Sequence, residues 1–384
     1  MGRRLERPRP ARDAIHSIVY RKESEFCGWP FYCGLWKLPA GDLLVGFKRI
    51  QNAYGSAAEV SHLKLTVGQG ELHLIRSHDN GRNWDPATLL PVYRLSTTKE
   101  EISALGPDNY VPEGGLDFTD GNVLTMSGTT PAFLKPESRA WLRASTDGGR
   151  SWRRPILLPL CGLGSLTGHG SAMTRSDGVQ LLGLSTTTPD GWTHRPLVYA
   201  STDGVEWRFL SFVTSAIEGG SAVSDRAAGP VFGATRHFYT RLIELADGRI
   251  LASIRFQRDA RDVMWTDIFA SDDGGRTWGF LSRVNDWGAP GDLVQMRDGR
   301  VACVYGYRVN PPGIRARISE DGGKSWGTEI VLRDDGGSWD LGYPRVIEIE
   351  PGRLLTVYYI NRRDDPVQMN GGVRHIAQTV FSPD

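Results

Sequence analysis

Tyrosine and histidine recur at one repeated position along this chain of 384 residues, and side chains of these types can carry acid–base or nucleophilic chemistry. The position lies eight residues before each of six Gly-containing turns, and it holds in chain order Tyr32, Pro112, His169, Tyr239, Pro290 and Tyr343. A tyrosine hydroxyl, with a pKa of about 10, becomes a nucleophile when a neighbouring base takes its proton. A histidine exchanges protons near neutral pH. These residue types therefore predict a polar site instead of an aliphatic core.

Two further positions of the same register carry charged side chains. The first of these positions lies two residues after the tyrosine/histidine position, and it faces the same side of the sheet if the strand alternates regularly. It holds Gly34, Gly114, Ser171, Arg241, Asp292 and Arg345. Eight residues after each turn stand Lys48, Gly128, Ser185, Arg255, Gly306 and Tyr359. A single member of these sets is most simply a core residue or half of an ion pair. The three sets together predict a polar cavity where the six strands converge.

Six turns define this register, namely Ala40-Gly41, Asp120-Gly121, Asp177-Gly178, Asp247-Gly248, Asp298-Gly299 and Pro351-Gly352. Short alternating apolar strands flank each turn, and no useful length of chain has helical periodicity. The pattern therefore predicts an all-β, six-bladed β-propeller. We expect Ile15–Tyr20 to complete the sixth blade, because closing the ring removes exposed sheet edges. Residues 1–13 are then a flexible tail, and residues 14–384 form a single domain.

A second repeat has the form Ser-x-Asp-x-Gly-x-x-Trp. It is complete at residues 77–84, 145–152, 271–278 and 319–326, and it is one residue short at residues 201–207. The Ser and Asp side chains can bond the backbone of their own turn, Gly supplies a permissive dihedral angle, and Trp can pack back onto the sheet. We therefore assign these five segments to hairpin turns of the first five blades and not to catalysis.

The second repeat is the Asp-box, and its recurrence makes the chain resemble the sialidase-like six-bladed propellers. The resemblance implies a glycosidase site in which three arginines hold the substrate carboxylate, a Tyr assisted by a Glu attacks the anomeric carbon, and an Asp protonates the leaving group. Tyr343, in Leu341-Gly342-Tyr343-Pro344, matches the nucleophile. Arg255 matches the second arginine, and Arg308 matches the third with looser spacing.

Three positions depart from the pattern of that family. The first arginine is missing, because the first blade reads Pro30-Phe31-Tyr32-Cys33-Gly34. Tyr239 replaces the Glu that activates the nucleophile, and Tyr359 replaces the Glu that braces the first arginine. Because the first arginine and the Glu that supports it are both missing, the pattern indicates a binding site with altered specificity.

The proton donor also differs from the family's Asp. The loop of residues 51–62, where that Asp is expected, has Glu59 as its one carboxylate, and His62 could pair with it. An ordinary solvated loop residue is an equally good interpretation of Glu59. Other carboxylates that the register could bring to the cavity are Glu113, Asp292, Asp340 and Asp286. Two of them flanking a sugar would support hydrolysis by a pair of carboxylates instead.

The leading hypothesis is an exo-acting glycoside hydrolase that takes a terminal sugar at the propeller axis. Tyr343 would be nucleophile or base, Glu59 the proton donor and Arg255 the carboxylate ligand. Substrate-binding residues would be Tyr32, His169, Tyr239, Arg241, Asp292, Arg308 and Arg345. Sialic acid, a uronic acid, a deoxyhexose and an arabinoside are all candidate substrates. A polysaccharide lyase using His169 and a tyrosine, and a non-catalytic carbohydrate- or protein-binding propeller, are the alternatives.

Composition narrows the classes of partner. The chain has 45 basic and 44 acidic side chains, a balance of +1 that predicts neither nucleic-acid nor membrane binding. The first twelve residues lack the apolar stretch of a signal peptide, so we expect a cytosolic protein. No cofactor motif is found, so we expect none. Cys27 and Cys33 could form a disulfide, but buried free thiols are the better interpretation.

Overall fold

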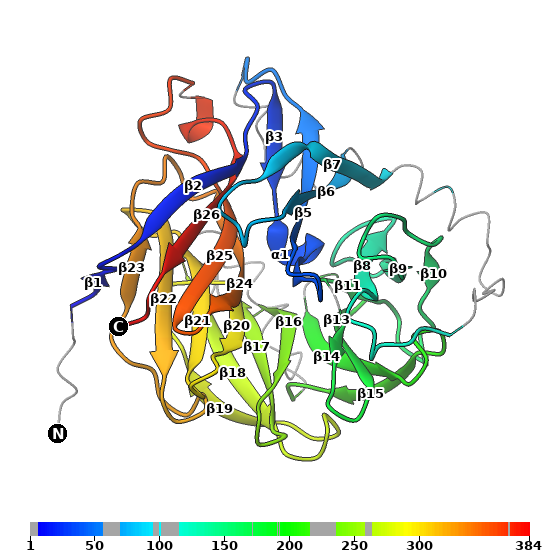
Figure 1. The fold of residues 1–384 in the computed structure, drawn as a ribbon. Coiled ribbons are helices and arrows are strands. Elements are labelled where there is room, and N and C mark those ends of the chain that lie inside the picture. Colours follow the sequence, from blue (N-terminus) through cyan, green and yellow to red (C-terminus); the bar gives the residue numbers. More distant parts are fainter. Residues whose placement is uncertain are drawn as a thin grey trace, which may run out of the picture.

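The computed structural model describes residues 7–56, 70–94, 100, 115–170, 172–189, 191, 193–215, 236–257, 263–367 and 369–384. Within these ranges the strands form six sheets, which lie around a common centre (Figure 1). The predicted six-bladed β-propeller is therefore confirmed. Each of the six predicted turns joins two antiparallel strands or leads into a strand of its blade.

The first three blades follow the chain order of the repeats. Blade 1 consists of β3 (Glu25–Gly28), β4 (Leu35–Lys37), β5 (Leu43–Gln51), β6 (Glu71–Ser77) and β7 (Asp85–Arg94). Blade 2 consists of β8 (Leu124–Thr130), β9 (Arg139–Ser145) and β10 (Ile156–Leu157). Blade 3 consists of β11 (Thr167–Gly168), β12 (Met173–Thr174), β13 (Gln180–Thr187), β14 (His194–Ser201) and β15 (Arg208–Phe212).

The last three blades complete the ring. Blade 4 consists of β16 (Arg236–Glu244), β17 (Ile250–Gln257), β18 (Met264–Ser271) and β19 (Gly279–Arg283). Blade 5 has β20 (Gly291–Gln295), β21 (Val301–Tyr307), β22 (Gly313–Ser319) and β23 (Ile330–Arg333), joined by β1 (Arg9–Pro10). Blade 6 has β24 (Gly342–Glu350), β25 (Arg353–Ile360), β26 (His375–Phe381) and β2 (Ile15–Tyr20). The short helices are α1 (Pro30–Cys33) and η1 (Met369–Gly371).

The two ends of the chain close the ring together. β2 pairs antiparallel with β26, so the N-terminal strand completes blade 6 as predicted (Figure 1). The preceding segment differs from the predicted flexible tail, because Arg9 and Pro10 pair in parallel with β23 of blade 5. The structure therefore attaches part of the 1–13 segment to a second blade.

The Asp-box segments have the predicted turn chemistry. In the box of blade 4, Ser271 Oγ donates to Asp273 Oδ1 (2.8 Å) and accepts from the backbone nitrogen of Gly275 (2.9 Å). Asp273 also accepts from the backbone nitrogen of Thr277 at 2.9 Å. Gly275 has a φ of 90°, a conformation that strains any residue with a Cβ atom. The same bonds recur in the other boxes, so each hairpin satisfies its own Ser and Asp side chains.

Each box hairpin also bonds to the blade before it. Three indole nitrogens donate across a blade boundary, from Trp84 to Gln378 Oε1 (2.9 Å), from Trp278 to Ser211 Oγ (3.0 Å) and from Trp326 to Ser282 Oγ (3.0 Å). The box of blade 3 accepts the backbone nitrogen of Leu116 at the carbonyl of Asp203, 2.8 Å away. The boxes thus join neighbouring blades as well as capping their own, which supports a structural role.

The inner strands are irregular at the register position that the sequence singled out. In blade 1, α1 interrupts the strand between β3 and β4, and it carries Tyr32. In blade 3 the strand breaks between β11 and β12, where His169 lies. In blades 4 and 6 the pairing register shifts by one residue at Tyr239 and Tyr343, as in a β-bulge. These breaks turn the side chains away from the sheet and toward the centre.

Candidate active site at the propeller axis

Three tyrosines, which we call the axial tyrosines, meet where the blades converge. They are Tyr32 of α1, Tyr239 of β16 and Tyr343 of β24. Ring centroids lie 5.3 Å apart for Tyr32–Tyr239 and for Tyr32–Tyr343, and 5.9 Å apart for Tyr239–Tyr343. Side-chain hydrogen bonds join Tyr239 to both of the others. Residues of blades 1, 4 and 6 can touch one another only near the axis, so this cluster marks the centre of the ring.

The backbone holds two of the axial tyrosines in a costly conformation. Tyr239 has a φ of 68° and Tyr343 a φ of 50°, both in the left-handed region that non-Gly residues rarely adopt. Such a residue costs about 1–3 kcal/mol and is found mainly at functional sites. Both side chains are nevertheless buried, with 6% and 3% exposure. The same strain at equivalent positions of two blades indicates that it serves to present the hydroxyl groups.

Two buried arginines surround Tyr343. Arg255 donates from Nη1 to the Tyr343 hydroxyl at 3.1 Å and from Nη2 to Gln257 Oε1 at 2.8 Å. The Arg308 guanidinium lies 5.1 Å from the Tyr343 ring centroid, and a side-chain hydrogen bond joins the two residues. The Nε atoms of Arg255 and Arg308 are buried and have no hydrogen-bond partner within the described ranges. These arginines therefore retain donors for a further group.

One buried carboxylate, Asp340, lies near Tyr343. Tyr359, whose ring centroid is 6.0 Å from that of Tyr343, donates its hydroxyl to Asp340 Oδ1 at 2.6 Å. Arg374 Nε donates to Asp340 Oδ2 at 3.3 Å, and Arg374 is 2% exposed. Burial opposes the charge of Arg308, but nearby Tyr343, Tyr359 and Asp340 raise its pKa above the usual value. Asp340 is therefore present at the site, as the sequence suggested, but it is held by two partners.

His169 approaches the axial tyrosines from blade 3. Its ring centroid lies 5.3 Å from that of Tyr239, edge on, and its Nε2 lies 2.8 Å from Ser185 Oγ. Burial lowers the pKa of His169 to about 3, so the imidazole is neutral near pH 7. Its Nδ1 has no partner among the described residues. Lys48, also in the predicted ring, lies 5.9 Å from the Tyr32 centroid, and desolvation lowers its pKa.

Three charged residues that the sequence predicted at the site bond to one another. Arg241 Nε and Arg345 Nε both donate to Asp292, at 2.8 and 3.1 Å, and the backbone nitrogen of Val346 donates to it at 2.8 Å. These residues come from β16, β20 and β24, so the network joins three blades. The bulges add one residue between each tyrosine and the arginine after it, and regular alternation therefore fails. These bonds give the three residues a role in joining the blades, and their contact with a substrate stays a prediction.

The other candidate carboxylates fall into two groups. Asp286 is 72% exposed and pairs with Arg283 at 3.6 Å, so the structure does not place it in the axial cluster. Glu59, His62 and Glu113 lie outside the described residues, as does Ser171. The proton donor proposed from the sequence is therefore neither supported nor contradicted by the geometry.

Sequence reasoning missed Arg374, Gln257 and Phe133. Phe133 packs against Tyr32 and His169, with centroids 5.7 and 5.8 Å away. Arg374 comes from the segment between η1 and β26, outside the register of the inner strands. Gln257 was detectable, because it lies two residues after Arg255 on the same face of β17.

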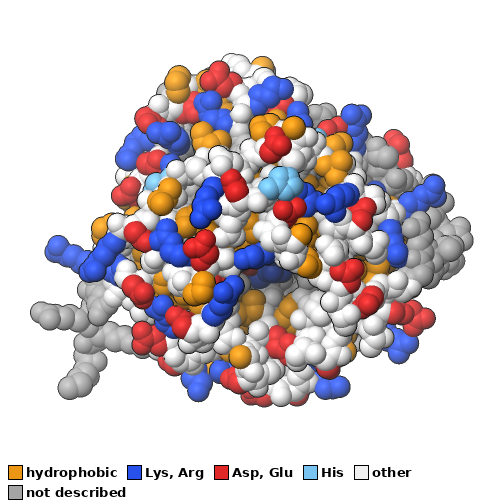
Figure 2. Space-filling model, viewed as in Figure 1, with side chains coloured by type: hydrophobic (Ala, Val, Ile, Leu, Met, Phe, Trp, Pro, Cys, Tyr) orange, Lys and Arg blue, Asp and Glu red, His pale blue; other side chains and the backbone are white. Residues whose placement is uncertain are grey.

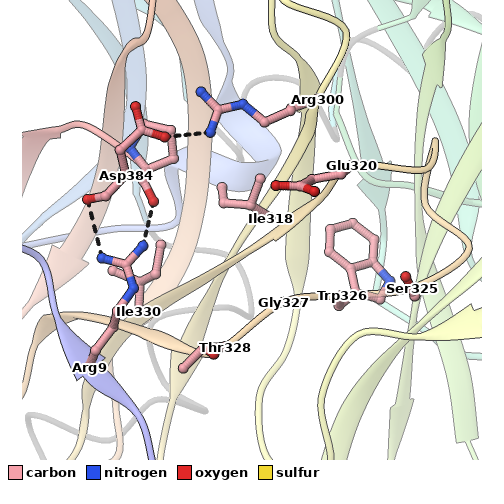
Figure 3. Close-up of a pocket in the computed structure, with 11 residues that line it drawn as sticks. Arg9, Arg300, Ile318, Glu320, Ser325, Trp326, Gly327, Thr328, Ile330 and Asp384 are labelled. Carbon is pink, nitrogen blue, oxygen red and sulfur yellow. Dashed lines mark hydrogen bonds and ion pairs between the residues drawn. The ribbon is translucent and has the colours of Figure 1, made fainter. Parts of the chain in front are cut away.

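A hollow of about 420 Å³ lies at the edge of blade 5, where the two chain ends meet (Figure 3). Arg9 Nη1 donates to the backbone oxygen of Asp384 at 3.2 Å, and Arg300 Nη1 donates to Asp384 Oδ1 at 2.6 Å. Figure 3 shows both guanidinium groups turned toward Asp384. Because these charges satisfy one another, we assign the hollow to ring closure.

Several broader features complete the description of the protein. The cysteines Cys27, Cys33 and Cys303 are buried free thiols, and Cys161 is an exposed one. In the space-filling view, basic and acidic side chains are interspersed (Figure 2). In the part of the chain that the structure describes, no helix is long and apolar enough to cross a membrane. No cluster of three or more metal-ligating side chains occurs in the same ranges.

The fold and the repeats define a sialidase-like BNR propeller, and the chain belongs to the BNR repeat-like domain family, which it matches over residues 117–356. No curated protein matches the sequence. A Dyadobacter fermentans protein of unknown function is 23% identical, with a TM-score of 0.72 and coverage of 96% of this chain and 97% of that one.

Glycosidases are among the similar structures. The Hadza microbial sialidase Hz136 is 17% identical, with a TM-score of 0.61 and coverage of 93% of this chain and 66% of that one. The Penicillium chrysogenum α-L-arabinanase is 12% identical, with a TM-score of 0.61 and coverage of 97% and 99%. At these identities the similarity establishes the fold, and the chemistry depends on the site.

Proposed function

We propose that this protein is an exo-acting glycoside hydrolase that binds a terminal acidic sugar at the axial tyrosines. The observation that carries the proposal is the buried contact of Arg255 Nη1 with the Tyr343 hydroxyl, at 3.1 Å on the axis. Sialidases and an arabinanase share the fold, which supports a glycosidase without naming the sugar. The spare donors of Arg255 and Arg308 suit a carboxylate or a set of hydroxyl groups.

The proposed chemistry begins with Tyr343. Its hydroxyl oxygen, after losing the proton, forms a bond to the anomeric carbon, while the bond from that carbon to the leaving oxygen breaks with its electron pair. The leaving oxygen takes a proton from a general acid, for which Glu59 remains the proposal. A water molecule then attacks the anomeric carbon, gives up a proton, and releases Tyr343. Tyr32, Tyr239 and His169 would surround the sugar ring.

Turnover of fluorogenic aryl glycosides tests this function. The panel is the α-sialoside, β-glucuronide, α-rhamnoside, α-fucoside and α-arabinofuranoside, each with wild type and Tyr343→Phe. We expect release from at least one member by the wild type and a loss of about a thousandfold in the variant. Release from the sialoside would show that the missing first arginine is dispensable. Wild-type silence on the whole panel would overturn the hydrolase.

A polysaccharide lyase is the second candidate, and the position of His169 favours it. Its imidazole lies 5.3 Å from the Tyr239 ring, centroid to centroid, and its Nδ1, which has no partner among the described residues, can accept the proton next to a uronate carboxylate. The electron pair left behind forms a carbon–carbon double bond, and the bond to the departing glycosidic oxygen breaks, with a tyrosine returning a proton. The unsaturated product absorbs ultraviolet light, whereas a hydrolase product does not. Absorbance released from uronate-containing polysaccharides therefore separates the two reactions.

A further inference from the structure

The positive charges around Tyr343 lack a matching carboxylate. Within the described ranges, neither Arg255 nor Arg308 has a carboxylate oxygen at ion-pair distance. The two side chains are only 5% and 7% exposed. A buried charge without a counter-charge is strongly unfavourable, costing several kcal/mol, so a neighbouring group is expected to compensate it. Asp340 lies nearby but is already bonded to Tyr359 and Arg374.

Tyr343 is the titratable group that both arginines contact. Arg255 donates to its oxygen at 3.1 Å, and a side-chain hydrogen bond joins it to Arg308. Tyr239, which is bonded to Tyr343, can donate a third hydrogen bond to the same oxygen. An oxygen with two guanidinium donors and one hydroxyl donor is well placed to hold a negative charge.

The remaining titratable and charged groups of the cluster do not compete for this role. Burial raises the pKa of Tyr32, Tyr239 and Tyr359 well above 10, so these hydroxyls stay protonated. His169 is neutral, and Lys48 faces Tyr32 and not Tyr343. Among the described residues, the titratable and charged groups that face Tyr343 directly or through one neighbour include Tyr32, Tyr239, Arg255, Arg308, Asp340, Tyr359 and Arg374.

We propose that Tyr343 rests as a phenolate held by Arg255 and Arg308, so that this pair of arginines does the work of the activating Glu at whose position Tyr239 stands. Its proton leaves to solvent before substrate binds, and no proton acceptor is then needed during attack on the anomeric carbon. The use of this phenolate as a nucleophile rests on the proposed function. The ionisation itself requires no substrate and can be measured in the free protein.

The test is a pH titration of the near-ultraviolet absorption of tyrosinate. The chain has 12 tyrosines, so the signal of Tyr343 is isolated as the difference between wild type and Tyr343→Phe. We expect that difference to titrate at least one pH unit below the ordinary value of about 10. Arg308→Gln should move the midpoint upward by about one unit. If the absorption difference between wild type and Tyr343→Phe titrates at or above pH 10, the inference is overturned.

Tyr358 provides a matched control. It is a buried tyrosine beside Arg333, but Arg333 is paired with the carboxylate of Asp335, so its charge is already balanced. The difference between wild type and Tyr358→Phe should therefore titrate above pH 10. If Tyr343→Phe does not fold, the titration of the wild type alone tests the inference. The inference predicts that one tyrosinate per chain forms below pH 9. If Tyr343 is an ordinary buried tyrosine, no tyrosinate should form below pH 9.

This readout separates the inference from the function. If Tyr343 titrates below pH 9 but the protein cleaves no glycoside, the resting phenolate is supported and the proposed hydrolase function is contradicted. If glycoside cleavage depends on Tyr343 but Tyr343 titrates above pH 10, the hydrolase function is supported and the resting phenolate is contradicted.

Discussion

The Asp-box hairpins and the axial cluster treat polar groups in opposite ways. In the boxes every Ser and Asp is bonded to its own turn, and the backbone and side chain of Asn83 lower the pKa of Asp79 to about 2. At the axis, Arg255 and Arg308 keep buried donors without partners, and Tyr239 and Tyr343 have strained backbones. Satisfied groups of this kind stabilise a scaffold, whereas buried donors without partners and strained backbones are typical of functional sites.

This contrast predicts that axial changes lower activity while box changes lower stability. The largest effect is expected for Arg255→Met, which removes the donor to Tyr343. We expect kcat/KM on the best glycoside to fall by about 10²–10³ with an unchanged unfolding midpoint. Arg283→Met, on the outer strand of the same blade, is the control and should cost no more than a few-fold. An equal fall in kcat/KM in both variants would contradict the proposed difference between the axial cluster and the rest of the blade.

The pH dependence of stability separates the same two regions. Burial lowers the pKa of His169 to about 3 and of His237 and His375 to about 4, below the unfolded value of 6.5. The unfolded chain therefore binds more protons below pH 6.5, and stability falls as the pH drops through that window. Box carboxylates such as Asp79 titrate lower, between their unfolded value of 3.8 and about 2.

The measurement is the free energy of unfolding in urea at pH 7.5 and pH 4.5. We expect a clear loss at pH 4.5, before any box carboxylate is protonated, and a smaller loss in His169→Gln. The same free energy at both values would contradict the assignment of neutral buried histidines.

A smaller effect is expected from opening one box. Ser271→Ala removes the group that bonds both Asp273 and the Gly275 backbone, leaving a buried nitrogen unsatisfied. We expect a loss of about 1–3 kcal/mol in stability with kcat/KM retained. Ser325→Ala removes a hydrogen bond to an exposed part of another box and should cost less. A loss of turnover in Ser271→Ala at full folding would refute the structural role.

The smallest effect is expected at ring closure. Arg9→Ala removes hydrogen bonds to the backbone of Pro383 and Asp384, one of them exposed. Exposed contacts of this kind contribute about 0–1 kcal/mol. Urea unfolding should show a change within that range, and a larger loss would mean that β1 stabilises the ring more than its two residues suggest.

Much of the fold could be predicted from the sequence because its signals are local. The six turns and five boxes carry their structure in adjacent residues, and β2 completed blade 6 as its alternating pattern predicted. The register also brought Tyr32, His169, Tyr239 and Tyr343 to neighbouring positions, since the blades are related by rotation about one axis.

Other contacts of the candidate site depend on features that no local sequence pattern predicts. The one-residue bulges at Tyr239 and Tyr343, and the bonds of Arg241 and Arg345 to Asp292, were not predictable from spacing alone. Arg374 reaches Asp340 from a segment outside the repeat, so only the tertiary structure shows their contact. Spacing within a repeat therefore predicted which residues lie at equivalent positions of the blades. Contacts that depend on backbone irregularities or on distant segments could not be predicted from it.

The most direct test of the account compares Tyr343→Phe with wild type on the best substrate of the glycoside panel. Loss of one hydroxyl leaves the ring packing intact, so the unfolding midpoint should remain unchanged. The account predicts that kcat/KM falls by about a thousandfold. Turnover within a few-fold of wild type would contradict the central claim that Tyr343 carries the chemistry at the axis.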